Sequence, residues 1–293
     1  MTDRRPDTDP RDPSATLLLG TISLDRYLAT ADVLPGGGVL NMAWHWRYRL
    51  RRPFLLLTRI GAEDGGPIDR FLRRNGIEVA SPQDLSAEGR SSSIDIQIQP
   101  DRQPWMDNFV PGVWDSYRLT PREEDALIRA DHLHVVLVEG AITELQRFGG
   151  ESFMDDVDVS ADFLGFRHYT VERLAETMRY VDLGFVGWPG AEDAPEVAGM
   201  RKVAFDQGKA IVVTLGARAV LVFDGPRGKE RRYPVKPVEV TGTTLGCGDA
   251  FIAWYLDEYG RGGSHDAAVA QGMIGGAQAT AWQRPLPDDA YGP

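Results

Sequence analysis

Short runs of apolar residues recur along the chain and alternate with segments of helical periodicity. Such runs cover residues 17–22, 54–58 and 132–140, and each has the length and composition of a strand buried on both faces of a sheet. Between two of them, an amphipathic stretch at 67–74 predicts a helix. This β-α-β rhythm favours a single large α/β domain built on a mainly parallel sheet.

The same rhythm resumes after residue 120. Thr120 is a good helix cap and Pro121 suits the first helical position, so together they predict a helix start. We expect Glu139 and Asp162, where two predicted strands end, to face the same crevice. The other predicted elements are a strand at 157–163, helices near 171–179 and 194–207 with a strand between them, a strand–turn–strand at 209–225 and a last helix at 264–283.

A different pattern covers residues 89–119. Polar and apolar residues alternate over 91–99, which is typical of a strand with one face in water, and 105–110 can return beside it after a turn. Such a hairpin among buried strands predicts a small sheet that projects from the main domain as a lid. Trp105 and Trp114 would close a small core of their own there, the alternative being that they offer flat faces to a ligand.

The composition narrows the class of protein. A formal charge of −11 argues against a nucleic-acid partner, because phosphates call for basic surfaces. One cysteine excludes an internal disulfide and suits a reducing, cytoplasmic location. No apolar run approaches the roughly 18 residues that span a bilayer. The polar, proline-rich start predicts a disordered tail over residues 1–15 and not a signal peptide.

Candidate chemistry lies in a glycine turn near the end of the chain. An apolar pattern with helical spacing follows the turn formed by Gly246, Cys247 and Gly248. Backbone N–H groups at the start of a helix have no partners within the helix, so this turn is a candidate anion site. Asp249 would repel such an anion, so it serves either as a helix cap or as a general base beside a bound phosphate. Upstream, residues 35–50 predict a second helix whose start carries Gly37, Gly38 and Asn41. Because glycine has no side chain, a ligand can come close to the backbone there. Asp25 follows the first strand.

Two motifs resemble the ribokinase-like, PfkB-type carbohydrate kinases. GGGVLNMA at 36–43 is similar to the family's Gly-Gly segment ending in Asn-x-Ala, and TTLGCGDAF at 243–251 is similar to its Asp-Thr-x-Gly-Ala-Gly-Asp signature. Supporting matches lie at 19–27, 60–66 and 213–225. The resemblance implies a three-layer α/β/α sandwich over residues 16–293, with a small β-sheet lid formed by 26–35 and 89–119.

The resemblance also implies roles for individual residues. Asp249 would be the catalytic base, and the N–H groups of Gly246, Cys247 and Gly248 would hold the charge of the transferred phosphoryl group. ATP would be the donor, with Mg²⁺ as cofactor, and a small sugar-like molecule the acceptor. Within the family, the motifs look most like the fructosamine (fructoselysine) kinase branch. The acceptor would be held by Asp25, Gly37, Gly38, Asn41 and Arg102, and the nucleotide phosphates would lie against Thr214 and Gly216.

Three positions depart from the family pattern. Thr243 stands where the signature opens with Asp, and Ala219 replaces a glycine. The family's Asn-x-x-Glu motif, tied to magnesium, is missing from 187–196, where Glu192 and Asp193 are the nearby carboxylates. The metal ligands are therefore unassigned, and either the cation is held another way, the donor is unusual or catalysis has been lost.

Other interpretations remain open at this point. A nucleoside kinase would use aromatic lid residues to stack on a base, and a catalytically silent relative would only bind sugar or nucleotide. Cys247 fits packing better than nucleophilic catalysis, and His132 and His134 fit a structural role better than a metal site. A homodimer through the lid is also expected, since an exposed sheet edge favours pairing.

Overall fold

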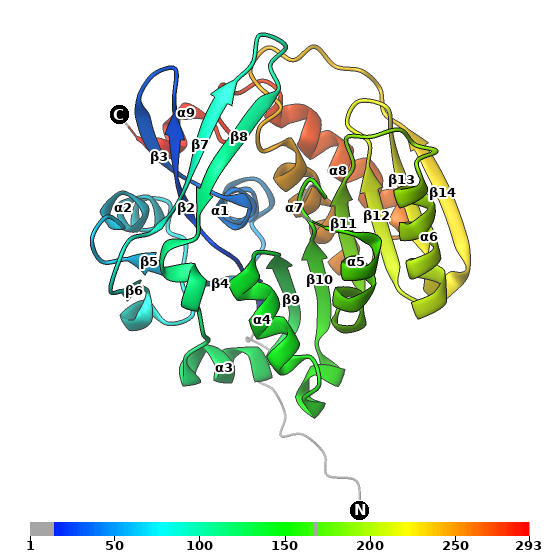
Figure 1. Ribbon diagram of the computed structural model, residues 1–293, viewed down its shortest axis with the longest axis horizontal. Helices are drawn as coiled ribbons and strands as arrows, with labels where there is room; N and C mark the ends of the chain where they lie inside the picture. The colour runs from blue at the N-terminus through cyan, green and yellow to red at the C-terminus, as the bar shows by residue number, and fades with distance from the viewer. Residues whose placement is uncertain (1–14, 167–168, 293) are drawn as a thin grey trace, which may run out of the picture.

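Eight strands form the central sheet of the protein, in the order β14-β13-β12-β11-β10-β9-β1-β4 (Figure 1). The computed structural model describes residues 15–166 and 169–292, so the expected tail at 1–15 lies, apart from Ala15, outside the described residues. From β12 to β4 all neighbours are parallel, and only β13 runs in the opposite direction, antiparallel to both β12 and β14. The strands are β1 Ala15–Leu19, β4 Leu55–Leu57, β9 Ala130–Val136, β10 Asp158–Asp162, β11 Leu183–Gly187, β12 Ala210–Thr214, β13 Ala219–Asp224 and β14 Lys229–Pro234.

Two apolar cores lie on opposite faces of this sheet. Alternation within β1 shows the division, because Leu17 and Leu19 belong to one core and Leu18 to the other. The first core is covered by α3 Pro121–Ile128, α4 Glu139–Phe148, α5 Val171–Thr177 and α6 Pro195–Gln207. The second is covered by α1 Gly38–Trp44, α2 Gly66–Arg74, α7 Cys247–Gly260 and α8 His265–Ala279. The expected three-layer α/β/α arrangement is confirmed.

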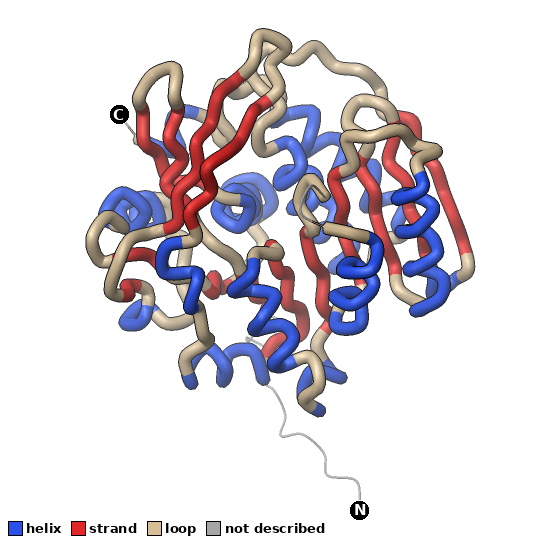
Figure 2. Tube along the Cα trace, in the orientation of Figure 1, coloured by secondary structure: helices blue, strands red, loops and turns tan. Residues whose placement is uncertain are grey.

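A second, four-stranded sheet stands apart from the first (Figure 2). Its order is β3-β2-β7-β8, with β2 Ser23–Tyr27 parallel to β7 Ser92–Ile98 and antiparallel to β3 Asp32–Gly36, while β7 pairs with β8 Pro104–Val110 as a hairpin. Segments far apart in sequence thus build one small sheet. A short pair, β5 Ile60–Gly61 with β6 Ser86–Ala87, and the C-terminal α9 Asp288–Tyr291 complete the larger elements.

The structure corrects three expectations from the sequence. Asp25 does not follow a strand of the main sheet but lies within β2 of the small one. Trp114 is 1% exposed and stacks on Tyr117, whereas Trp105 is 39% exposed on β8, so the two tryptophans do not close one core. Glu139 is exposed and pairs with Arg173, so it does not share a buried crevice with Asp162.

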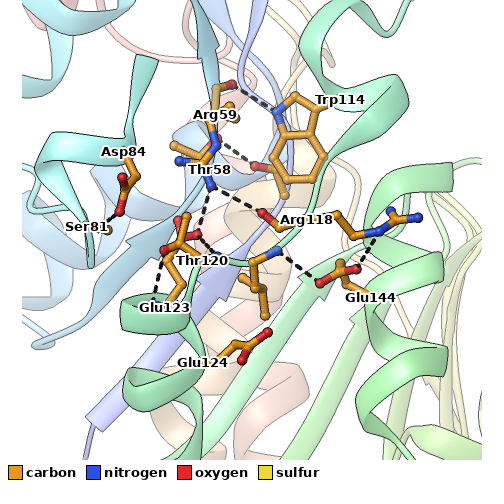
Figure 3. Close-up of polar contacts among 12 residues, drawn as sticks. Thr58, Arg59, Ser81, Asp84, Trp114, Arg118, Thr120, Glu123, Glu124 and Glu144 are labelled. Carbon is orange, nitrogen blue, oxygen red and sulfur yellow. Dashed lines mark hydrogen bonds and ion pairs between the residues drawn. The ribbon is translucent and has the colours of Figure 1, made fainter. Parts of the chain in front are cut away.

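A buried ion pair joins the turn between β4 and β5 to α3 (Figure 3). The Arg59 guanidinium lies 2.8 Å from the Glu123 carboxylate, and the Arg59 carbonyl accepts a 3.0 Å hydrogen bond from the Trp114 indole. Glu123 also accepts from the Thr120 N–H, so the carboxylate completes the capping box of α3. The predicted start of α3 is therefore confirmed. None of the helices in residues 15–166 and 169–292 is both long and apolar enough to cross a membrane.

Candidate functional site

The glycine turn at 246–248 opens α7 and places Asp249 in the first helical turn. Gly246 is the N-cap, with a φ of 82°, and no side chain caps the helix. Asp249 therefore does not cap α7. Cys247 and Gly248 are the first helical residues, so their N–H groups have no partner within the helix; that of Cys247 donates a 3.2 Å hydrogen bond to the Thr244 carbonyl in the preceding turn. This geometry suits an anion at the turn.

Asn41, in the middle of α1, meets Asp249 across the site. Its Nδ2 atom donates a 2.7 Å hydrogen bond to Oδ2 of Asp249. The Asn41 side chain is buried, and its Oδ1 has no hydrogen-bond partner among the described residues. A buried carbonyl oxygen without a partner costs free energy. A ligand hydroxyl at this position would satisfy it.

Two further carboxylates surround Asp249. Burial raises the pKa of Asp25 to about 7, with the Ser23 hydrogen bond opposing and the charge of Asp249 adding. Burial, then the charge of Asp249, raises the pKa of Asp162 to about 7, against a hydrogen bond from the Leu164 N–H. Burial also raises the pKa of Asp249 to about 6, against the Asn41 hydrogen bond. Three carboxylates thus share one region, and at neutral pH Asp25 and Asp162 retain protons to a greater extent than Asp249, which is mostly ionised.

Residues 36–38 are glycines because their backbone lies close to the Asp25 and Asp249 carboxylates and leaves little room for side chains. A Cβ on Gly36 would lie 1.9 Å from Oδ2 of Asp25, and one on Gly38 would lie 3.0 Å from Oδ1 of Asp249. Gly37 has a φ of 102°, a conformation that L side chains rarely adopt. Any side chain in this segment would displace a candidate site residue or strain the backbone.

The tip of the β7–β8 hairpin touches the segment just before α7. The carbonyl of Arg102 accepts hydrogen bonds from Oγ1 of Thr243, at 3.0 Å, and from the Thr244 N–H, at 3.1 Å. Gln103 Oε1 accepts a 2.8 Å bond from the Thr244 hydroxyl. The backbone of Arg102 thus makes these contacts, with a φ of 68°, while its side chain is exposed.

The underside of the small sheet packs on the same segment. Tyr27, Ile96 and Leu245 form a small apolar cluster, joined by the partly buried Leu34, Ile94 and Ile98. Tyr27 follows Asp25 by two positions on β2, so both project from one face of the sheet. The face that carries Asp25 is therefore the face that rests against the 243–249 segment.

The remaining predicted residues lie at the carboxyl ends of the strands. Thr214 ends β12, and Gly216 follows it in an exposed turn with a φ of 61°. Asp162 ends β10, two strands away in the same sheet.

Cys247 shows no sign of thiolate activation, because burial and the charge of Asp249 raise its pKa to about 12. His132 and His134 each hydrogen-bond the Ser160 hydroxyl at 2.8 Å.

The expected magnesium ion has a limited set of protein ligands here. Glu192 is half-buried and forms an ion pair with Arg232 at 2.7 Å. Among the residues that the structure describes, no group of three or more His, Cys, Asp or Glu side chains could hold a metal. Mg²⁺ usually takes only one or two carboxylates together with water and substrate phosphates. Asp162, which is buried, and Asp249, which is partly buried, are carboxylates that fit this limited role.

Several site residues escaped the sequence analysis. Gly36 was passed over in favour of its two neighbours, and Ser23, which donates a 2.6 Å bond to Asp25, carries no motif signal. Asp162 was noticed only as a strand end. Thr243 was read as a departure from the family, yet it is fully buried and binds the hairpin tip. Only tertiary contacts identify these roles.

Known proteins resemble this chain both in fold and in sequence. No protein-family model matches the chain. The chain superposes on a Schistosoma mansoni adenosine kinase, solved with adenosine in an occluded loop conformation, with a TM-score of 0.78 and 14% identity, covering 94% of this chain and 97% of that one. A ribokinase from Thermotoga maritima gives a TM-score of 0.73 at 16% identity, with 94% and 96% covered. Fructoselysine 6-kinase of Escherichia coli is 24% identical over 87% of this chain and 92% of its own length.

The two structural matches cover nearly the whole chain and show that it has the ribokinase fold. The sequence relative matches along almost its whole length and agrees with the motifs at 36–43 and 243–251. The chain thus resembles the ribokinase-like, PfkB-type carbohydrate kinases in fold, in overall sequence and in these two motifs.

Proposed function

We propose that the protein transfers the γ-phosphoryl group of ATP to a hydroxyl of a small sugar-derived acceptor, with Asp249 as general base. The observation that carries this proposal is the Asn41–Asp249 contact beside the anion turn at 246–248. A base whose pKa is about 6 is mostly ionised at neutral pH and can accept a proton from a hydroxyl.

In this mechanism, Asp249 accepts the proton of the acceptor hydroxyl as the hydroxyl oxygen attacks the γ-phosphorus of ATP, and the bond from the γ-phosphorus to the β,γ-bridging oxygen breaks, so that ADP leaves. The N–H groups of Gly246, Cys247 and Gly248 bind the transferring phosphoryl oxygens, where charge develops. Mg²⁺, when bound with the nucleotide, would neutralise phosphate charge, and Asp162 is the buried carboxylate best suited to assist it. Asp25 and Asn41 would hold the acceptor, and Thr214 and Gly216 would border the nucleotide phosphates.

The small sheet would act as a lid over the acceptor. Its Asp25 face rests on the 243–249 segment, and the hairpin tip at Arg102 and Gln103 is bonded to Thr243 and Thr244. Closure of this kind excludes water that would otherwise accept the phosphoryl group. The edge strand β8 exposes Trp105, Met106, Phe109 and Val110, which supports the expectation of a homodimer through the lid.

For the acceptor, we favour a fructosamine such as fructoselysine, because the sequence relative with the broad match is a fructoselysine 6-kinase. The buried Asp25 and Asp162 favour a neutral or cationic acceptor over an acidic one. A nucleoside acceptor is the second candidate, supported by the adenosine kinase fold match. The exposed Trp105 provides one aromatic face on the hairpin for that case.

The test is ATP-dependent phosphorylation of a panel of fructosamines, free sugars and nucleosides, comparing wild type with Asp249→Asn. The substitution keeps the shape of the side chain and removes the base, so kcat should fall on the order of 10²–10⁴-fold. Acceptor binding, measured by calorimetry, should persist. If Asp249→Asn turned over at the wild-type rate, Asp249 would not be the base. If no acceptor were phosphorylated by wild type, the silent-relative interpretation would replace this one.

A further inference from the structure

Helix α1 continues into a π-helical segment, η1 His45–Leu50, that delivers a cluster of arginines to the surface. Arg47, Arg51 and Arg52, together with Pro53, line a concavity of about 310 Å³. The π-helix is a rare conformation that occurs often at functional sites. None of these residues belongs to the phosphoryl-transfer site described above.

The concavity combines one anchored guanidinium with two free ones. Arg52 donates to the carbonyl of Leu256, at 2.6 Å, and to the hydroxyl of Thr16, at 3.2 Å. Arg47 and Arg51 are exposed, and neither pairs with an acid within residues 15–166 and 169–292. The site is therefore positively charged on a chain whose net charge is −11.

Neighbouring acidic side chains do not cancel the positive charge of the concavity. The acid that acts on Arg52 from α7 is Asp257, and it is already paired with Arg261 at 3.0 Å. Arg261 in turn lowers the pKa of Arg52 together with burial, so it adds positive charge to the surroundings. An anion entering the concavity would meet the exposed guanidinium groups of Arg47 and Arg51, neither of which pairs with a carboxylate in the part of the chain that the structure describes.

The backbone at Arg51 is held in a conformation that its side chain disfavours. Arg51 closes η1 with a φ of 52° and a ψ of 35°, where glycine is the usual residue. For an L-residue this conformation is unfavourable, because the Cβ atom lies too close to the following carbonyl oxygen. Strain of this kind concentrates at binding sites. Arg47 is accommodated by Gly76, where an added Cβ would lie 3.2 Å from the Arg47 Nη2 atom.

We propose that this arginine concavity binds a small phosphate-type oxyanion, either free phosphate or the phosphate group of a small phosphorylated metabolite. The planar guanidinium fork matches phosphate oxygens in pairs. The volume is at the lower end for ligand sites and suits a small molecule. The strongly negative net charge opposes a long polyanion such as nucleic acid.

The same arginines connect the concavity to the helices of the phosphoryl-transfer site. Trp46 donates a 2.8 Å hydrogen bond to the carbonyl of Ala253, and Arg52 binds Leu256, so η1 is fastened to α7. Asn41 lies in the middle of α1, and Asp249 lies in the first turn of α7. A bound anion would therefore stiffen the α1–α7 pair, and phosphate should raise the melting temperature of the protein.

The test is calorimetric titration of the full chain with inorganic phosphate and, separately, glycerol 3-phosphate, at an ionic strength held constant with chloride. Arg47→Gln/Arg51→Gln should weaken binding at least tenfold. Arg129→Gln/Arg179→Gln removes the same charge from exposed sites elsewhere and should bind like wild type. Tighter binding of glycerol 3-phosphate would identify a metabolite as the ligand, and equal or weaker binding would identify free phosphate.

A second variant guards against misfolding. Arg51→Gly removes one guanidinium and relieves the left-handed strain, so it should melt no lower than wild type while binding phosphate several-fold more weakly. Phosphate binding unchanged in both concavity variants would overturn the proposal and assign the anion to the 246–248 turn. Failure of wild type to bind either probe would also overturn it, leaving the arginines as stabilising charges at a helix C-terminus. Neither result depends on kinase activity.

Discussion

Asn41 and Asp249 are 208 positions apart in sequence, yet the amide of one donates a 2.7 Å hydrogen bond to the carboxylate of the other. This bond favours the ionised form of Asp249, while burial disfavours it, and the pKa of Asp249 settles at about 6. The side chain that orients the candidate base is thus the side chain that keeps it ionised at neutral pH.

Removing this bond should therefore change the pH dependence of the reaction. A base acts only when deprotonated, so kcat/KM of wild type should fall as the pH drops through about 6. In Asn41→Leu, the opposing hydrogen bond is lost, the pKa of Asp249 rises, and the acid limb moves to higher pH. Profiles of kcat/KM between pH 5 and 9 measure the shift. If the acid limb of the kcat/KM profile were at the same pH in both proteins, the group that titrates in this limb would not be Asp249.

A methyl group at Gly36 should disturb the acceptor side of the site. Gly36→Ala places a Cβ 1.9 Å from the Asp25 carboxylate, which must move away. We expect KM for the acceptor to rise at least tenfold, because Asp25 is proposed to hold it, while KM for ATP changes little. Gly150→Ala is the matched control, since a Cβ there meets no atom within 4 Å. Equal effects on both KM values would argue for a general disruption of the fold.

The bond between Thr243 and the hairpin tip predicts how the lid opens. Thr243→Val keeps the shape but leaves the Arg102 carbonyl and the Leu245 N–H without this hydroxyl, at a cost of about 1–3 kcal/mol. Amide exchange across residues 92–110 should accelerate. Thr244→Val removes a more exposed hydroxyl and should have a smaller effect.

Thr243→Asp, which introduces the Asp that opens the kinase signature, should disturb the hairpin tip more strongly than Thr243→Val. A carboxylate in Thr243→Asp only accepts hydrogen bonds, so it would repel the Arg102 carbonyl and release the tip. Unchanged exchange in both Thr243 variants would show that the hydroxyl does not hold the hairpin.

The buried pair of Arg59 and Glu123 predicts a large effect on stability. Arg59→Met leaves the Glu123 carboxylate buried without its partner and should lower the free energy of unfolding by about 3–5 kcal/mol. Arg73→Met breaks an exposed pair with Asp69 and should cost about 0.5 kcal/mol or less. Urea denaturation measures both. Adding Glu123→Gln to Arg59→Met should recover part of the loss, because glutamine keeps the capping bond to Thr120 without the charge.

Local patterns in the sequence were enough to predict the main domain. Buried strands read as continuous apolar runs because both faces of a parallel sheet are covered, and Thr120 with Pro121 marked a helix start correctly. The edge strand β14 was missed, because its charged residues carry no apolar pattern and it is held by pairing with β13. The hairpin at 92–110 was recognised from alternation, but its parallel pairing with β2 was not.

The sequence by itself also determined which residues carry candidate chemistry, since the turn at 246–248 and the glycines at 36–38 have local conformational signatures. Tertiary structure alone decided which of them meet. It placed Asp25 on the small sheet, brought Asp162 toward Asp249, and gave Thr243 a partner at Arg102. The physical reason is that hydrogen bonds and pKa shifts depend on distance and burial, which arise between segments far apart in the chain and leave no periodic trace within either one.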